Sequence, residues 1–194
     1  MKEIFEFIKA TEALKRELRH SWLSDGRQES VAEHSWRMSL MLILIENKLP
    51  KSFNQLRALK MAIVHDLVEM YAGDVPVFNF LNSKKLHSQK KQKEKDAMFR
   101  IAGELSDSNG KEVESLWREY ENSHTVEAKV VKALDKLEAQ IQHNQAGLDT
   151  WEEIEYELTF RLDKYVSFNS DLEELKNLVV KDAIELYQEK GIKI

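Results

Sequence analysis

Prolines are almost absent from this chain: there are two in 194 residues, Pro50 and Pro76. Proline breaks an α-helix because it lacks a backbone donor and its ring clashes with the preceding turn. Only six glycines interrupt a sequence rich in the strong helix formers leucine, glutamate, lysine, alanine and glutamine. The sequence therefore predicts an all-α fold and excludes a sheet-rich one. We expect about seven or eight helices in a single domain that spans residues 1–194.

Four short motifs mark predicted helix starts. Each pairs a hydroxyl residue with an acid or amide three positions later, the capping-box pattern that satisfies unpaired N–H groups at a helix start. The motifs are Ser30-Val-Ala-Glu33, Ser52-Phe-Asn-Gln55, Thr150-Trp-Glu-Glu153 and Ser170-Asp-Leu-Glu173. Together with apolar spacing and the stop signal of Gly73 and Pro76, they predict helices near residues 31–47, 53–72, 83–105, 110–122, 125–145, 150–166 and 171–190.

Composition also restricts the classes of site and partner. The chain has no cysteine, which excludes disulfides, thiolate metal sites and a cysteine nucleophile. The N-terminal residues mix charges through an amphipathic pattern, and the apolar run 40–45 is far shorter than the roughly twenty residues that span a bilayer. A net charge of −5 gives no general attraction to nucleic acid. We therefore expect a cytoplasmic protein with no membrane and no stable nucleic-acid partner.

Charged residues interrupt the apolar stretch MAIVHDLVEMYAGDVP, residues 61–76. His65, Asp66 and Glu69 lie within one turn of each other on a helix, so their side chains crowd one side. Gly73 ends the helix and allows Asp74 to turn back toward them. Burying charge is costly unless the group is paired or bound to a metal. The stretch therefore indicates a site, unless the helix is less buried than it looks.

Two further residues extend this cluster. His34 lies at a capped helix start, and Asp135 lies in the middle of an apolar helix. With His65 and Asp66 they make two imidazole and two carboxylate ligands, a set that suits Mn, Co, Fe, Zn or Mg. From spacing alone the alternative stays open, since a single histidine on a helix is often a core or surface residue and a His-Asp pair is common by chance.

His34, the pair His65-Asp66 and Asp135, in this order on an all-helical chain, resemble the HD-domain superfamily of metal-dependent phosphohydrolases. Three longer strings, ESVAEHS at 29–35, HDLVEMYAGDVP at 65–76 and KALDKLE at 132–138, look like its 5′-deoxynucleotidase branch. The segments LWREYE at 116–121 and EAKVV at 127–131 are similar to the relatives of that branch found in bacteria and eukaryotes. The resemblance runs from about Arg19 to Gln142.

The resemblance implies a single HD-domain helical bundle with a metal-binding core at about 19–142. The C-terminal helices, 150–190, would pack on this core or form a dimer interface. It implies a metal-dependent phosphohydrolase that removes phosphate from (deoxy)nucleoside 5′-monophosphates. Such an enzyme would take one divalent ion per chain (Mn, Co, Mg, Fe or Zn), bind a nucleotide monophosphate and form a homodimer.

Site residues follow from the resemblance position by position. The implied metal ligands are His34, His65, Asp66 and Asp135. Glu69 and Asp74 match the acidic residues near the substrate: Glu69 would orient or deprotonate the attacking water, and Asp74 would hold the sugar or assist the leaving group. Arg19 matches a phosphate-binding arginine. His20 follows it where the family often has a tryptophan that disfavours a ribose 2′-hydroxyl, which leaves the choice between deoxyribose and ribose open.

Other functions on this scaffold stay open from the sequence. The alternatives are a phosphodiesterase, a di-iron oxygenase, or a non-catalytic nucleotide-binding helical module. A second metal would need extra histidines; His87 is set among lysines and His124 precedes a predicted helix start, so we expect a mononuclear site. The lysine-rich run at 83–95 could attract nucleotides, but a solvated helix face is the commoner explanation for such a run.

Overall fold

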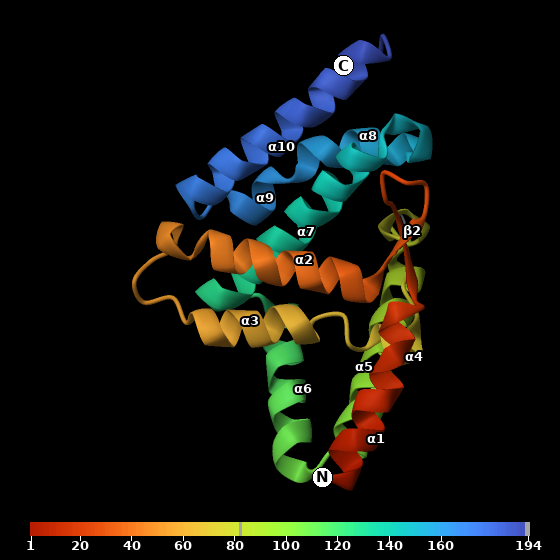
Figure 1. The fold of residues 1–194 in the computed structure, drawn as a ribbon, viewed down its shortest axis with the longest axis vertical. Coiled ribbons are helices and arrows are strands. Elements are labelled where there is room, and N and C mark those ends of the chain that lie inside the picture. The colour runs from red at the N-terminus through yellow and green to blue at the C-terminus, as the bar shows by residue number, and fades with distance from the viewer. Residues whose placement is uncertain (82, 193–194) are drawn as a thin grey trace.

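The computed structural model describes residues 1–81 and 83–192, and its architecture is all-α, as predicted (Figure 1). Seven helices in these residues have nine or more residues: α1 (Lys2–Ala10), α2 (Val31–Leu44), α3 (Gln55–Val64), α5 (Lys84–Glu104), α6 (Asp107–Asn122), α7 (Val126–Ala146) and α10 (Ser170–Glu189). Three shorter ones, α4 (Glu69–Ala72), α8 (Glu153–Leu158) and α9 (Asp163–Val166), lie between them. None of the helices described has both the length and the apolar character needed to cross a membrane.

Helix α7 lies at the centre of the fold, and α2, α3, α6, α9 and α10 pack against it. Val130, Leu134 and Leu137, which recur at helical spacing, are buried on α7, and Ile141 packs against the same core from a partly buried position. A second small cluster, formed by Leu148, Ala183 and Tyr187, joins the end of α7 to α10. The central helix therefore fixes the positions of the helices that carry the charged residues.

A two-stranded antiparallel sheet precedes α2, and the sequence did not predict it. Strand β1 (Leu18–Trp22) pairs with β2 (Gln28–Ser30), and Gly26 takes a positive φ of 86° in the turn between them. The strands are too short to show an alternating apolar pattern. This hairpin matters for function because β1 carries Arg19 and His20 and lies against α7.

Only the first of the four predicted capping boxes is confirmed. Ser30 accepts a hydrogen bond from the Glu33 backbone N–H, and the Glu33 side chain accepts one from the Ser30 N–H. The other three predicted starts are wrong by one or two residues: the N-caps are Asn54, Glu152 and Asn169. Asparagine caps a helix as well as serine does, so at two of these starts a neighbouring Asn, Asn54 or Asn169, displaces the predicted serine. The helix predicted from 110 also begins earlier, at Asp107.

Two of the predicted helices are broken. The helix expected over 53–72 ends at Val64, and a tight turn precedes α4. In that turn the N–H groups of Leu67 and Glu69 bond to carbonyls three residues back, which winds the chain more tightly than an α-helix. The helix expected over 150–166 is likewise divided into α8, a 3₁₀ turn (Thr159–Arg161) and α9. Periodicity alone does not reveal such breaks, because a 3₁₀ turn keeps nearly the same apolar spacing.

The close crossing of α5 and α6 generates a test of the packing. A Cβ placed on Gly110 in α6 would lie 2.4 Å from the Ala102 carbonyl oxygen of α5, whereas a Cβ on Gly103 meets nothing within 4 Å. We expect Gly110→Ala to lower the free energy of unfolding by about 1–3 kcal/mol because the helices must separate. Gly103→Ala, the matched control, should raise it by about 0.5–1 kcal/mol. Urea denaturation measures both values, and a Gly110→Ala protein as stable as the native one would contradict this packing.

Candidate metal centre

Two buried histidines face each other at the centre of the charged cluster. His34 lies in the first turn of α2 and His65 directly follows α3, and their ring centroids are 5.4 Å apart. In each ring Nδ1 already has a partner: the Glu138 carboxylate for His34, and the Ala62 carbonyl at 2.8 Å for His65. Both Nε2 atoms are buried, and neither has a hydrogen-bond partner among the residues that the structure describes. Each ring is therefore held in an orientation that leaves Nε2 available to a ligand.

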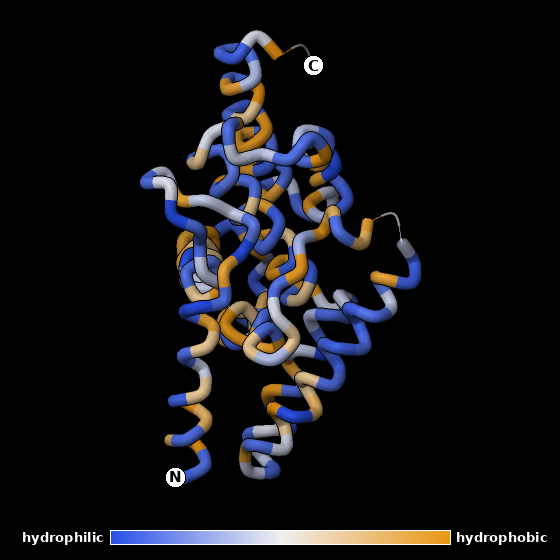
Figure 2. The backbone as a smooth tube through the Cα atoms, turned by 90° about the vertical axis from the view of Figure 1, so that its right-hand side faces the viewer, coloured by the Kyte–Doolittle hydropathy of each residue, from blue (hydrophilic) through white to orange (hydrophobic). Residues whose placement is uncertain are grey.

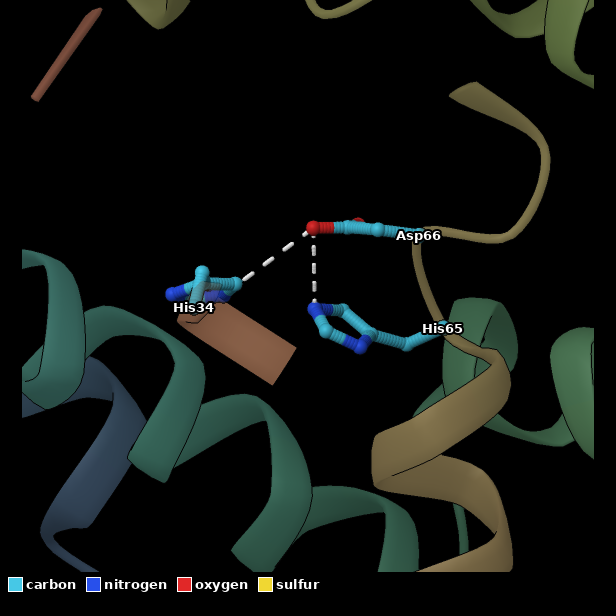
Figure 3. Close-up of side chains that lie close together, drawn as sticks. All are labelled: His34, His65 and Asp66. Carbon is cyan, nitrogen blue, oxygen red and sulfur yellow. Dashed lines mark ion pairs between the residues drawn. The ribbon is translucent and has the colours of Figure 1, made fainter. Parts of the chain in front are cut away.

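Asp66 meets these two free nitrogens (Figure 3). Its Oδ2 lies 3.0 Å from His65 Nε2 and 3.9 Å from His34 Nε2, and the three ligand atoms lie within 4.8 Å of one another. Burial acts to raise the pKa of Asp66, but His65 and His34 outweigh it and hold this pKa well below its usual range. The structure thus brings together three of the four residues predicted to bind the metal, with Asp66 ionised.

Asp135 adjoins this group from α7. Its Oδ1 lies 3.4 Å from His34 Nε2, while Oδ2 accepts a hydrogen bond from the Tyr120 hydroxyl and lies 3.0 Å from Lys136 Nζ. One carboxylate oxygen of Asp135 is therefore held in place by two partners, and the other faces the histidine. Asp135 is buried, and a buried carboxylate is costly unless neighbouring groups compensate its charge. Its partners supply that compensation.

The residues present fit a divalent cation. Two unpartnered imidazole nitrogens and carboxylate oxygens are the donor set that such ions take. Burial and Arg19 act to lower the pKa of His34, but the carboxylates Glu138 and Asp135 outweigh them and raise it to about 9. The surrounding carboxylates therefore favour a positive charge at His34. A bound cation would supply this charge in place of the imidazole proton, which it would displace.

A second group of close ligand atoms, from Glu29, His34 and Glu138, has a different character. Arg37 Nε donates a hydrogen bond of 2.7 Å to Glu138, and Arg19 Nε lies 3.4 Å from Glu29. Because arginines already compensate these carboxylates, the group supports His34 and is not itself suited to an ion. Sequence reasoning assigned Glu138 and Glu29 no role. A signal was present for Glu138, which lies three residues after Asp135 and so on the same side of α7.

Arg19 lies beside the metal ligands. Its side chain is only 13% exposed, and its NH1 donates a hydrogen bond of 3.3 Å to Asp66 Oδ2. Its guanidinium is therefore not a solvated surface charge, the alternative that the neighbouring charged residues suggest. Burial acts to lower the pKa of Arg19, and the surrounding carboxylates, above all Asp66, raise it. An always-charged guanidinium next to the donor set is well placed to bind an anion.

The two predicted catalytic acids lie near this arginine. Glu69 begins α4 and is buried, and its Oε2 has no hydrogen-bond partner. Burial, together with the charges of Asp66 and Asp74, raises the pKa of Glu69 well above its usual value. Gly73, with φ of 75°, ends α4 as predicted, and burial also raises the pKa of Asp74. Carboxyl groups with raised pKa values are suited to proton transfer near neutral pH.

Asp74 is held beside the hairpin by its backbone, and its carboxylate lies near β1. Its backbone N–H donates a hydrogen bond of 2.8 Å to the Glu17 carboxylate, just before β1. The His20 backbone N–H lies near its carboxylate and acts to lower the pKa of Asp74 in part. Asp74 is therefore held next to β1 rather than free in a turn.

The side chain of His20 does not join the group around Asp66. It packs against Phe78, with ring centroids 4.9 Å apart, and its Nε2 lies 3.6 Å from Glu155 Oε1. His143 Nε2 lies 3.5 Å from the same oxygen, and burial raises the pKa of Glu155 to about 7. The structure thus connects His20 to α7 and α8, and only its backbone contacts the site through Asp74.

The two extra histidines considered for a second metal, His87 and His124, are both exposed. His87 stacks edge-on against Phe80, with ring centroids 5.7 Å apart, and His124 lies with Lys111 and Arg118 around a surface hollow. Neither belongs to a group of close ligand atoms among the residues that the structure describes. Among the described residues, neither of these histidines therefore provides a ligand for a second metal ion beside His34, His65 and Asp66.

Comparisons with known proteins agree with this geometry. A sequence model of the HD domain family, described as "HD domain", matches residues 11–176. The 5′-deoxynucleotidase HDDC2 of Danio rerio is 39% identical over 147 residues, which cover 75% of this chain and 70% of the relative. The protein of the same name from Homo sapiens is 32% identical over 146 residues, covering 74% of this chain and 68% of the relative.

A solved structure has a similar fold over nearly the whole chain. The predicted metal-dependent phosphohydrolase from Magnetospirillum magnetotacticum is 27% identical, with a TM-score of 0.78 and coverage of 95% of both chains. A second, the PH0347 protein from Pyrococcus horikoshii, has a TM-score of 0.69 at 28% identity and covers 92% of this chain and 99% of its own.

The contact between His34 and Glu138 generates a test of metal affinity. We expect Glu138→Gln to weaken divalent metal binding by about 10–100-fold, because a neutral amide orients and polarises the imidazole less well than a carboxylate. Glu157→Gln, which removes a carboxylate that is 63% exposed, is the matched control and should leave the affinity unchanged. Competition with a metal-sensitive chelator measures both constants. Equal affinities in the two variants would show that Glu138 does not support the metal ligand.

Proposed function

Because the chain belongs to the HD domain family, we propose that it is a metal-dependent phosphomonoesterase that removes phosphate from (deoxy)nucleoside 5′-monophosphates. The observation that carries this proposal is the convergence of two buried, unpartnered imidazole nitrogens on Asp66, directly beside Arg19. A cation and a guanidinium at adjoining positions are the two groups that a phosphate monoester needs for binding and for charge neutralisation. The curated relatives are named for this activity, and the proposal extends it to this chain.

We propose that His34, His65, Asp66 and Asp135 hold one divalent ion per chain, with Mn, Co, Mg, Fe and Zn as candidates. When bound, the ion supplies a Lewis acid beside the phosphoryl group. Glu138 and the Ala62 carbonyl keep the two imidazoles oriented toward it through their Nδ1 atoms. Tyr120 and Lys136 do the same for Asp135.

Arg19 binds the phosphate in this proposal. Its planar guanidinium can donate two parallel hydrogen bonds to phosphoryl oxygens, a geometry that lysine cannot match. In the free protein the guanidinium donates to Asp66 instead, at 3.3 Å. We infer that this contact keeps the side chain extended toward the site before the substrate arrives.

Glu69 and Asp74 handle protons and the nucleoside. Glu69 orients a water for attack on phosphorus and accepts its proton at the unpartnered Oε2, for which a raised pKa is suitable. Asp74 holds the sugar or assists the leaving 5′-oxygen. The hydrogen bond from its backbone N–H to Glu17 keeps Asp74 next to β1, and His20 contributes to substrate binding through its main chain, which lies near the Asp74 carboxylate.

We further propose that the described helices form one domain acting in the cytoplasm, where nucleotide monophosphates are available. A di-iron site would need histidine ligands beyond His34 and His65, and His87 and His124 are exposed, which favours the phosphomonoesterase over that alternative. Glu69 and Asp74 together with the ligand set favour an enzyme over a non-catalytic nucleotide-binding module.

The activity can be tested with a panel of deoxyribo- and ribonucleoside 5′-monophosphates, adding Mn, Co, Mg, Fe and Zn singly. We expect the native enzyme to release phosphate only with metal, and Asp66→Ala to abolish both metal binding and release because it removes a ligand. Asp107→Ala, a substitution at a 98% exposed aspartate, is the control and should retain activity. Full activity of Asp66→Ala in metal-free buffer would overturn the proposal.

An apolar face on α2 and α3 supports a homodimer. On α2 the exposed side chains of Trp36, Leu40, Ile43 and Leu44 recur at helical spacing, and on the neighbouring α3 Leu56 and Ile63 are 65% and 62% exposed. Figure 1 shows the two helices side by side. Exposed apolar side chains gathered on neighbouring helices are typical of an interface. We propose that a second copy of this chain covers the face.

Light scattering after gel filtration tests this dimer. We expect the native protein to elute as a dimer, and the double variant Ile43→Glu/Ile63→Glu to elute as a monomer because it places charge in the contact. The control is Leu178→Glu, which replaces an exposed apolar residue of α10 in the same way but outside the proposed interface. This variant should remain dimeric. A double variant that stays dimeric would place the interface elsewhere.

A further inference from the structure

The lysine-rich run on α5 is not uniform. Six lysines lie between residues 84 and 95, and in Figure 2 the first half of α5 is mainly hydrophilic. Five of them are exposed, namely Lys84, Lys85, Lys91, Lys93 and Lys95. Lys90 differs, with a side chain only 23% exposed. The solvated-face explanation therefore accounts for five of the lysines and leaves Lys90 unexplained.

The surroundings of Lys90 place it beside the site. Helix α5 packs against α4, which begins with Glu69. The Lys90 ammonium lies over the Phe80 ring, 5.6 Å from its centroid, and Phe80 belongs to the segment that follows Asp74. Its ion-pair partner, Glu94, is itself only 13% exposed. Lys90 thus occupies a half-buried position between the helix that carries Glu69 and the segment that starts at Asp74.

Electrostatics link this ammonium to the acidic residues of the site. Burial acts to lower the pKa of Lys90, and Glu94, Glu69 and Asp66 outweigh it and raise this pKa. In turn, Lys90 opposes the rise in the pKa of Glu69 and of Asp74. The packing of α5 against α4 therefore places the Lys90 ammonium where it acts on the charges of Asp66, Glu69 and Asp74.

Charge balance favours a second cationic side chain beside Arg19 and the proposed metal ion. A phosphate monoester is a dianion near neutral pH, and it must approach Asp66, Glu69 and Asp74. Arg19 alone already compensates Asp66 and Glu29. Like charges at short range repel strongly where water is excluded. The two charges of the proposed divalent ion are matched by its own ligands Asp66 and Asp135, so a substrate dianion that approaches Glu69 and Asp74 gains from a second cationic side chain.

We propose that Lys90 is a second phosphate-binding residue, whose ammonium moves from Glu94 to a phosphoryl oxygen of the substrate while Arg19 binds the other oxygens. This inference rests on the proposed function for the identity of the substrate. An ammonium on a flexible stem suits this exchange, because it can leave one carboxylate and reach an anion without the fixed geometry of a guanidinium. Glu94 keeps the ammonium at the site when no substrate is bound.

The run itself provides the control for the test. Lys90→Gln and Lys91→Gln remove neighbouring positive charges that differ in exposure, and Lys90→Arg keeps the charge. With the metal present, we expect Lys90→Gln to raise both KM and the Kd for inorganic phosphate by about tenfold, the loss of one charge-assisted hydrogen bond. Lys91→Gln should stay within about twofold of the native enzyme, and Lys90→Arg should recover most of the affinity.

Calorimetric titration with inorganic phosphate separates this inference from the proposed function, since it needs no turnover. If Lys90→Gln and Lys91→Gln bind phosphate equally well, the inference is wrong, even where the native enzyme is an active phosphatase. If no nucleotide is hydrolysed but Lys90→Gln alone binds phosphate weakly, the phosphate site stands and the proposed reaction fails. Glu94→Gln, which frees the ammonium, should bind phosphate at least as tightly as the native protein, and weaker binding would also contradict the inference.

Discussion

The burial of ionisable side chains around His34 is the constraint on which the rest of the site depends. Three carboxylates are almost fully excluded from solvent, namely Glu29, Asp135 and Glu138. Burying an ionised group costs on the order of several kcal/mol unless partners compensate its charge. Arg19, Arg37 and Lys136 supply part of that compensation from three different elements. Helix packing therefore has to bring β1, α2 and α7 together before these charges can be accommodated.

The tight turn at residues 65–68 brings the proposed ligands of the metal site together. A continuous helix would have carried Glu69 and His65 along one face, as the sequence suggested. The shift to bonds between residues three apart ends α3 at Val64 and starts α4 at Glu69 with a new direction. Asp66 then meets both histidines, while Glu69 is buried with a free carboxylate oxygen. One short departure from helical geometry thus separates the proposed ligand function from the proposed proton-transfer function.

The sequence predicted the helical class and the residues that converge, and it failed where local competition decides the structure. His34, His65 and Asp66 could be found because charge in apolar helices made them candidates and the resemblance to the HD-domain superfamily made them ligands. The hairpin carrying Arg19 could not, since strands of five and three residues show no periodic pattern. Capping starts failed at Asn54 and Asn169, where two capping residues lie close together and only packing selects between them. Lys90 could not be singled out from the sequence, because the run 84–95 contains six lysines and only the structure shows that Lys90 is less exposed than the others.

The irregular pairing of β1 with β2 has a consequence for how this chain tolerates changes in length. Leu18 pairs with Ser30 and Trp22 with Gln28, so the register shifts within the strand that carries Arg19. The turn beyond it, residues 24–27, is exposed, and a Cβ on Gly26 would meet nothing within 4 Å. An insertion there would lengthen a free loop and leave Arg19 in place. An insertion between Ser30 and His34 would instead rotate the imidazole about 100° per residue around α2, away from Asp66. We therefore expect this segment to tolerate insertions in the turn 24–27 and to lose the metal site when residues are inserted between Ser30 and His34.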